Sequence, residues 1–226
     1  MYRVSDWKQG KSNYLMVKDD STHAQHYMLQ RYRSDIPEPV AGPPFNEYFE
    51  NDSHGRVLLC NNIVIGAAAM QFGDRHLQRG PSNSDHEDFD YVFAYQCDTL
   101  PSEILAWFDK MRHGFWPPQE IFDCVRHFPC FLVPDGYYAS LKKHLEWRMT
   151  PNLIERKLIL CLNMVQRKCL VVLKMIKKQE LVKYIQHEGC KFTTFHCKTA
   201  LFFTLERTPS DAWTKPRLLE CIVRTL

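Results

Sequence analysis

The hydrophobic pattern of the chain changes its period near residues 149 and 150, and this change constrains the fold more than any other feature. Before it, short apolar and β-branched runs such as residues 57–60 and 130–134 alternate with segments of helical spacing. After it, the spacing is helical over 151–162, 164–186, 192–206 and 217–226. We therefore expect an α+β chain, with a mixed region over 1–149 and an all-helical region over 150–226.

Local composition predicts the elements of the mixed region. Apolar and aromatic runs predict strands at 14–17, 26–33, 57–60, 89–97, 130–134 and 144–149. Helical spacing predicts helices at 102–112 and after Pro117 and Pro118. Asn61 and Asn62 can cap a helix over 63–72, but the Gly66-Ala-Ala-Ala69 run leaves helix and strand both open there. Irregular connections are expected at 34–55, which is rich in proline and acidic residues, and at 75–88, with a turn at Gly80-Pro81.

Cysteine usage and the lack of long apolar runs indicate the compartment. The nine cysteines are odd in number and scattered, and no Cys-x-x-Cys pair occurs among them. The first residues have no apolar core of a signal peptide, and no run approaches the length of a membrane span. We expect a cytoplasmic protein without a membrane segment rather than a secreted disulfide-bonded one.

The formal net charge of +3 conceals an uneven distribution along the chain. Residues 1–100 carry 9 basic and 14 acidic side chains, whereas residues 101–226 carry 20 basic and 12 acidic ones. An acidic N-terminal part and a basic C-terminal part can together build a site for a metal ion and a polyanion. Two separate solvated surfaces would give the same counts.

The acidic segment 85–90 offers a candidate metal ligand. Asp90 lies in the predicted strand 89–97, where a carboxylate can be held rigidly for a hard cation. Asp88 shares its face if the strand begins that early. Magnesium chemistry on phosphates uses two or three such carboxylates, and the alternative is a solvated acidic loop that leads into a strand.

Cations recur on one face of the predicted helix 164–186. Arg167, Lys174, Lys177 and Lys178 share that face, and the opposite stripe is apolar, with Cys169, Val172, Leu173 and Ile176. A row of cations on a rigid helix can hold phosphates, although an ordinary solvated face has the same pattern.

Metal-ligand residue types also gather near the C-terminal end of that helix. His187, Cys190, His196 and Cys197 occur within a short stretch, but their spacing lacks the tight pairs of structural zinc sites. We expect no zinc at these residues. The alternative is that they are ordinary side chains of the core or the surface.

Several segments after residue 80 follow one another in a recognisable order. They are GPS at 80–82, DYVFAYQC at 90–97, GFWP at 114–117, LVP at 132–134, LEWRM at 145–149 followed by Ile154-Glu155, CLVVLK at 169–174, FTTFHCKTALFF at 192–203, and Trp213. In this order and spacing the chain resembles the Mab-twenty-one (male-abnormal) family, which shares the nucleotidyltransferase fold of cyclic GMP-AMP synthase.

The resemblance implies a two-lobed enzyme that binds double-stranded nucleic acid and joins ATP and GTP into a cyclic dinucleotide with two magnesium ions. Carried over to this chain, Asp90 matches the third metal carboxylate and Arg148 an arginine that touches the acceptor nucleotide. Lys174 matches a lysine that holds the donor triphosphate. Thr194 and Phe195 match the pair that binds the donor and stacks on its base.

The chain also departs from that family. The family's Gly-Ser loop and its pair of acids do not occur here, and the resemblance implies that this catalytic part would lie upstream of Met1. The synthase's zinc-binding insertion would fall between Arg148 and Cys169, where this chain has a single cysteine and no histidine.

Three functions follow as hypotheses. The first is a catalytically deficient protein that keeps a nucleotide- or nucleic-acid-binding surface or serves as an interaction module. Its expected partners are ATP or GTP and double-stranded RNA or DNA, and its oligomeric state is left open. The alternatives are a fragment of an active magnesium-dependent nucleotidyltransferase of innate immune sensing, and a structural scaffold whose basic helix is only solvated.

Overall fold

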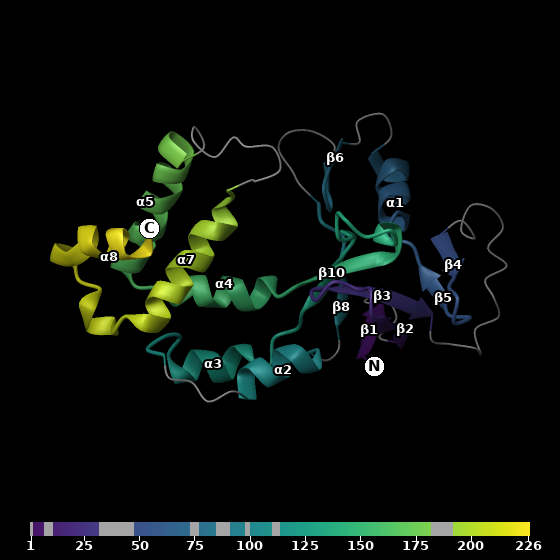
Figure 1. Ribbon diagram of the computed structural model, residues 1–226, viewed down its shortest axis with the longest axis horizontal. Coiled ribbons are helices and arrows are strands. Elements are labelled where there is room, and N and C mark those ends of the chain that lie inside the picture. The colour runs from purple at the N-terminus through teal and green to yellow at the C-terminus, as the bar shows by residue number, and fades with distance from the viewer. Residues whose placement is uncertain are drawn as a thin grey trace. The chain divides into compact units, whose positions relative to one another are not determined.

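The computed structural model describes residues 2–6, 11–31, 48–72, 77–84, 91–97, 100–109, 114–181 and 192–226. The chain divides into two compact units. The first unit consists of Met1–Leu105 and Pro129–Leu153, and the second of Ala106–Phe128 and Ile154–Leu226. The first unit holds a sheet and the second is helical, so the predicted α+β class is confirmed (Figure 1).

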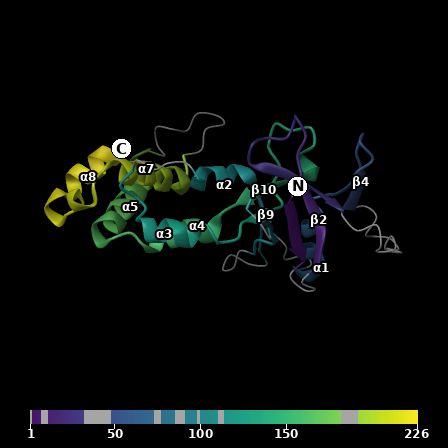
Figure 2. The ribbon, with the colours of Figure 1, turned by 90° about the horizontal axis from the view of Figure 1, so that it is seen from below.

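An eight-stranded antiparallel sheet forms the first unit. Its strands are β1 (Tyr2–Asp6), β2 (Lys11–Val17), β3 (His26–Arg31), β4 (Phe49–Asn51), β5 (Val57–Leu59), β8 (Tyr95–Cys97), β9 (Phe131–Val133) and β10 (Glu146–Thr150). Their order is β10-β9-β8-β1-β2-β3-β5-β4, and β10 also pairs with β3. The second pairing of β10 curls the sheet on itself, and β1 and β2 are the purple strands of Figure 2.

Both faces of the curled sheet carry buried apolar side chains, as the two-residue period of a strand allows. On one face, Trp147 is fully buried, lies 5.3 Å from the Tyr95 ring, and donates from Nε1 to the Leu59 carbonyl at 3.1 Å. The opposite face carries a cluster of buried residues: Leu15, Val17, Met28, Leu58, Cys60 and Leu145. The sheet is therefore part of the core on both sides.

Residues 63–72, for which the sequence left helix and strand open, form helix α1 (Ile63–Phe72). The Asn61 side chain just before it donates to the carbonyls of Lys143 and Glu146, each at 2.8 Å. The buried Glu146 carboxylate in turn accepts from the Tyr137 amide at 2.8 Å and from Ser140 Oγ at 2.7 Å. These polar contacts fix the loop that leads into β10, because each buried oxygen has a donor.

The second unit is built from helices. They are the C-terminal part of α2 (Ser102–Asp109), α3 (Gln119–Val125), α4 (Asn152–Leu160), α5 (Met164–Ile176), the π-helical turn η4 (Lys177–Leu181), α7 (Thr194–Arg207) and α8 (Leu218–Thr225), with short 3-10 turns η5 (Ser210–Ala212) and η6 (Lys215–Arg217). Helices α5, α7 and α8 pack against one another (Figure 1). Leu173, Leu201 and Leu205 are buried in this arrangement.

A capping box begins α5. The Asn163 side chain accepts from the amides of Val165 and Gln166, each at 2.9 Å, and the Gln166 side chain accepts from the Asn163 amide at 2.8 Å. We expect Asn163→Ala to lower the free energy of unfolding by about 1 kcal/mol, because two amides of the first turn lose their acceptor. Urea unfolding followed by circular dichroism measures this loss, and Asn163→Asp, which keeps an acceptor, is the control. Equal losses in both variants would contradict the capping role.

The structure corrects three of the predicted elements. Residues 75–88, expected as a loop, contain the hairpin β6 (Leu77–Arg79) and β7 (Ser82–Ser84), which turns at Gly80 with φ of 62°. Within 34–55, the described part contains β4. Among the described residues of the strand predicted over 89–97, Tyr95–Cys97 form β8 and Tyr91 forms an isolated bridge to Asn83. Residues 92–94 are exposed and belong to no strand, so their aromatic and β-branched composition alone did not form one.

Candidate functional site

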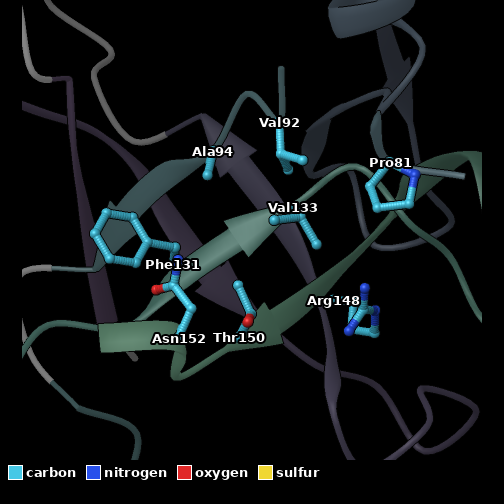
Figure 3. Close-up of a pocket in the computed structure, with 8 residues that line it drawn as sticks. All are labelled: Pro81, Val92, Ala94, Phe131, Val133, Arg148, Thr150 and Asn152. Atoms are coloured by element: carbon cyan, nitrogen blue, oxygen red, sulfur yellow. The ribbon is translucent and has the colours of Figure 1, made fainter. Parts of the chain in front are cut away.

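A pocket of about 480 Å³ opens on the first unit, within the size range of small-ligand sites. Its lining comes from the segment before β8, from β9, from β10, and from the residues beside them. These residues, drawn in Figure 3, are Pro81, Val92, Ala94, Phe131, Val133, Arg148, Thr150 and Asn152.

Strand alternation explains why β9 and β10 form the floor of this pocket. Arg148 lies opposite Val133, and Thr150 lies opposite Phe131, so these four side chains share one face. The residues next to them in each strand point to the other face, where Trp147 and Leu132 are fully buried. The same register that buries the core therefore presents one cation, one hydroxyl and two apolar side chains to the pocket.

Arg148 is the cation of the pocket. Its Nε donates to Asp135 Oδ2 at 2.8 Å, and the two side chains are 37% and 34% exposed. This ion pair is too exposed to add much stability, but it orients the guanidinium. No other hydrogen bond joins this guanidinium to a residue that the structure describes, so its terminal nitrogens can still donate to an anion.

The pocket mixes polar and apolar side chains around one cation. Figure 3 shows Phe131 and Arg148 on opposite sides of the lining, with Val133 between them. Thr150 and Asn152 lie near Phe131 and are polar, while Pro81 lies on the side of Arg148 and is apolar. A ligand with a flat apolar ring and an anionic group matches this arrangement, because the ring can lie on apolar carbon while the anion meets the guanidinium.

A buried histidine lies next to Arg148 on the neighbouring strand. His26 of β3 is opposite Arg148 of β10, and its Nδ1 has no hydrogen-bond partner among the described residues. Burial is the largest cause that lowers the pKa of His26, against a weaker opposing effect of Glu146. His26 is therefore neutral at pH 7, and Arg148 provides the positive charge at this place.

Three other residues predicted from the resemblance lie in the second unit. Lys174 is exposed near the end of α5, and Thr194 and Phe195 are exposed at the start of α7. Cys197 Sγ lies 3.9 Å from the Leu173 carbonyl, so Lys174 and the start of α7 are at the same end of this helix pair (Figure 1). Arg148 belongs to the first unit.

The start of α7 presents an aromatic ring. Phe195 is 58% exposed, and the Lys198 ammonium lies 5.8 Å from its ring centre. Lys198 also forms an ion pair with Glu155, and the Thr193 amide donates to His196 Nδ1 at 3.0 Å, which caps the helix. The ring is thus held on an ordered helix end, with its surface accessible for stacking.

The basic face predicted on α5 and η4 is present. Arg167, Lys174 and Lys178 are exposed, while Cys169 and Leu173 are buried on the opposite side. Lys177, Val172 and Ile176 are half-buried, so the predicted faces are confirmed only in part. Arg167 donates to the Leu160 carbonyl at 2.7 Å, and the binding of phosphate along this face stays a prediction.

The predicted metal ligand cannot be placed. Asp90 and Asp88 lie outside the described residues, as do His187 and Cys190. Within the described ranges, no three histidine, cysteine, aspartate or glutamate side chains gather closely enough to hold a metal ion. A magnesium site at Asp90 therefore stays a prediction, and no step of a reaction is assigned to it.

The described cysteines are free thiols, and most of them are buried. Burial raises the pKa of Cys60, Cys161 and Cys169, and it raises the pKa of Cys130 to about 11. These four thiols stay protonated near neutral pH and are poor nucleophiles.

None of the helices among the described residues combines the length and apolarity needed to cross a bilayer.

Sequence reasoning missed most of the pocket. It identified Arg148, but not Asp135, Phe131, Thr150 or Asn152. The signal that could have found Phe131 and Thr150 is the antiparallel pairing of the strands 130–134 and 144–149, which places alternate residues on one face. The sequence does not give the register of that pairing, and without the register the residues that share a face with Arg148 cannot be identified.

Residues 165–226 match the model of the Mab-21 protein HhH/H2TH-like domain. The match covers about a quarter of the chain, from α5 to α8, and includes Lys174, Thr194 and Phe195 but not Arg148. The resemblance predicted from the sequence is therefore confirmed at the level of this family's C-terminal domain. No curated protein matches the chain.

Proposed function

We propose that this chain binds a nucleoside phosphate in the pocket on β9 and β10 and does not itself join nucleotides. The observation that carries this proposal is the Arg148 guanidinium, oriented by Asp135 at one side of a pocket whose opposite side carries the Phe131 ring. A nucleobase fits against Phe131, where Thr150 and Asn152 offer polar partners, and a phosphate fits the terminal nitrogens of Arg148. The Mab-21 domain match supports this ligand class through the resemblance.

The nucleotidyltransferase fold is part of the same proposal. A curled antiparallel sheet followed by a helical unit agrees with that fold, and the Mab-21 match covers the helical part. Lys174, Thr194 and Phe195 then form a second set of nucleotide contacts, with Lys174 for phosphate and Phe195 for the base. Their shared position at one end of the α5–α7 pair supports this assignment.

Catalytic deficiency rests on the residues of this chain. It contains no Gly-Ser pair, and the only metal carboxylate that the resemblance assigns is Asp90. Metal-dependent phosphoryl transfer uses a pair of ions clamped by several carboxylates. We expect no linear or cyclic dinucleotide when the chain is incubated with ATP, GTP, Mg²⁺ and double-stranded RNA or DNA. A product that disappears in Asp90→Ala would instead support the active nucleotidyltransferase of innate immune sensing.

The nucleotide pocket is tested by Arg148→Ala. We expect the dissociation constant for ATP or GTP, measured by isothermal titration calorimetry, to rise by about tenfold or more, because hydrogen bonds to charged groups contribute about 1.5–3 kcal/mol. Lys143→Ala is the matched control, since it removes an exposed cation of the same unit that does not line the pocket. Equal affinities for wild type and Arg148→Ala would contradict the assignment.

Asp135→Asn tests the negative charge of Asp135 apart from its hydrogen bond with Arg148. The amide keeps an oxygen that can accept from Arg148 Nε but removes the negative charge that competes with a phosphate. Under the proposal this variant binds nucleotide more tightly than the wild type. The scaffold alternative predicts that neither this variant nor the joint neutralisation of Lys174, Lys177 and Lys178 changes nucleotide or RNA binding.

A cytosolic location accompanies the proposal. All cysteines within the described ranges are free thiols. Burial raises the pKa of five of them, which keeps these thiols protonated at neutral pH. Free buried thiols are typical of proteins that fold in a reducing compartment.

A further inference from the structure

We infer that the exposed face of α5 docks an acidic amphipathic helix of a protein partner. The face, called the α5 outer face below, consists of Met164, Lys168, Val171 and Met175. These positions follow one another at i, i+4, i+7 and i+11, which places them on one line along the helix. The inference is independent of the nucleotide pocket, which lies in the first unit.

The α5 outer face is apolar where a solvated face would be polar. Met164 is 61% exposed, Val171 is 56% exposed and Met175 is 51% exposed. The inner side of α5 is already used, because Cys169, Leu170 and Leu173 are buried and the helix packs on α7 and α8. A helix that is apolar on both sides has a second surface to cover, and single exposed apolar residues would not form such a line.

Cations border this apolar line. Arg167, Lys174 and Lys178 follow one flank of the α5 outer face at i, i+7 and i+11, and Lys168 lies within the line itself. Residues 164–181 contain five basic side chains and one acidic side chain, Glu180. Within the described ranges, no carboxylate forms an ion pair with Lys168 or Lys178. The surface is complementary to an apolar stripe bordered by Asp and Glu.

The composition of the face favours a helix over the other anionic partners. A lipid surface is usually met by Trp, Tyr or Phe at the interface, and the α5 outer face has none of them. A nucleic-acid backbone would cover Met164, Val171 and Met175 with charged oxygens, which gain nothing from apolar carbon. Methionine adapts its shape to apolar side chains of a partner, so two methionines in the line suit helix-on-helix contact.

The test uses a synthetic peptide as the partner. We would label an amphipathic helix of about 18 residues, or five turns, with leucines on one face and glutamates on both sides of it, and measure fluorescence anisotropy with the full chain. The paired variant Val171→Asn/Met175→Asn removes apolar surface without a change of charge. We expect it to weaken binding by about tenfold or more, as expected for apolar anchors of an interface. Lys168→Glu should weaken it similarly.

Controls separate docking from general attraction. Leu219→Asn, at a residue that is 73% exposed on α8, should leave the affinity unchanged, and a peptide with lysines in place of glutamates should not bind. Circular dichroism of each variant checks that the helices are retained. Equal affinity of wild type and Val171→Asn/Met175→Asn would overturn the inference. It would also be overturned if the paired change weakened binding to double-stranded RNA, or to phosphatidylserine vesicles, while leaving peptide binding intact.

Discussion

Trp147→Ala is expected to lower the free energy of unfolding by about 3–5 kcal/mol, the range for large-to-small changes at buried aromatic residues. Trp147 is fully buried in β10, packs on Tyr95 of β8, and donates to the carbonyl of Leu59 in β5. The indole thus connects three segments of the curled sheet. Its removal leaves a cavity and a buried carbonyl that has lost its donor.

Trp147→Phe separates these two contributions. The ring remains, but the Nε1 donor is lost, so we expect a loss smaller than that of Trp147→Ala. Urea unfolding of both variants, followed by far-ultraviolet circular dichroism, gives the two free energies. A Trp147→Ala variant as stable as the wild type would contradict the packing of the first unit.

Leu201→Ala is expected to destabilise the helical unit by about 2–5 kcal/mol. Leu201 is fully buried in α7, the helix that contacts both α5 and α8. The loss has two parts, the transfer of the removed carbons and the cavity that remains.

Phe203→Ala is the matched control for Leu201→Ala. Phe203 lies two residues further along α7 and is 55% exposed, so its truncation should lower the unfolding free energy by a much smaller amount. Both variants are compared by thermal and urea unfolding. If Phe203→Ala lost as much stability as Leu201→Ala, the assigned inner and outer faces of α7 would be wrong.

The helices were the most predictable part of the fold. The predictions at 102–112 and for the helices after residue 150 agree with the described helices, because apolar residues at helical spacing record which face is buried. Residues 63–72 are apolar almost throughout, so their pattern left helix and strand open, and the structure has a helix there. The helix α5 shows this directly, since Cys169 and Leu173 are buried as expected. The local signal was sufficient because each helix satisfies its own backbone hydrogen bonds.

Strands were less predictable, since a strand exists only through its partner. Residues 92–94 have strand-like composition but no ladder, and Leu77–Arg79 form a strand only because Ser82–Ser84 return beside them. The curl of the sheet depends on the pairing of β10 with β3, which are far apart in the sequence. Composition carries no information on such pairings.

The candidate site was predictable only in part for the same reason. Arg148, Lys174, Thr194 and Phe195 came from the resemblance, and the match to the Mab-21 domain supports the family but not their roles. The pocket around Arg148 is made by the register of β9 and β10, and by Asp135, whose position no local pattern indicates. Asp90 lies outside the described residues, so its role stays a prediction.

The most direct test of the nucleotide pocket is a titration of the isotopically labelled chain with ATP or GTP, followed by nuclear magnetic resonance. The proposal predicts chemical-shift changes concentrated in β9 and in residues 148–152, and their loss in Arg148→Ala. Shifts that leave these residues unchanged, or that persist without the Arg148 guanidinium, would contradict the central claim that this pocket binds a nucleoside phosphate.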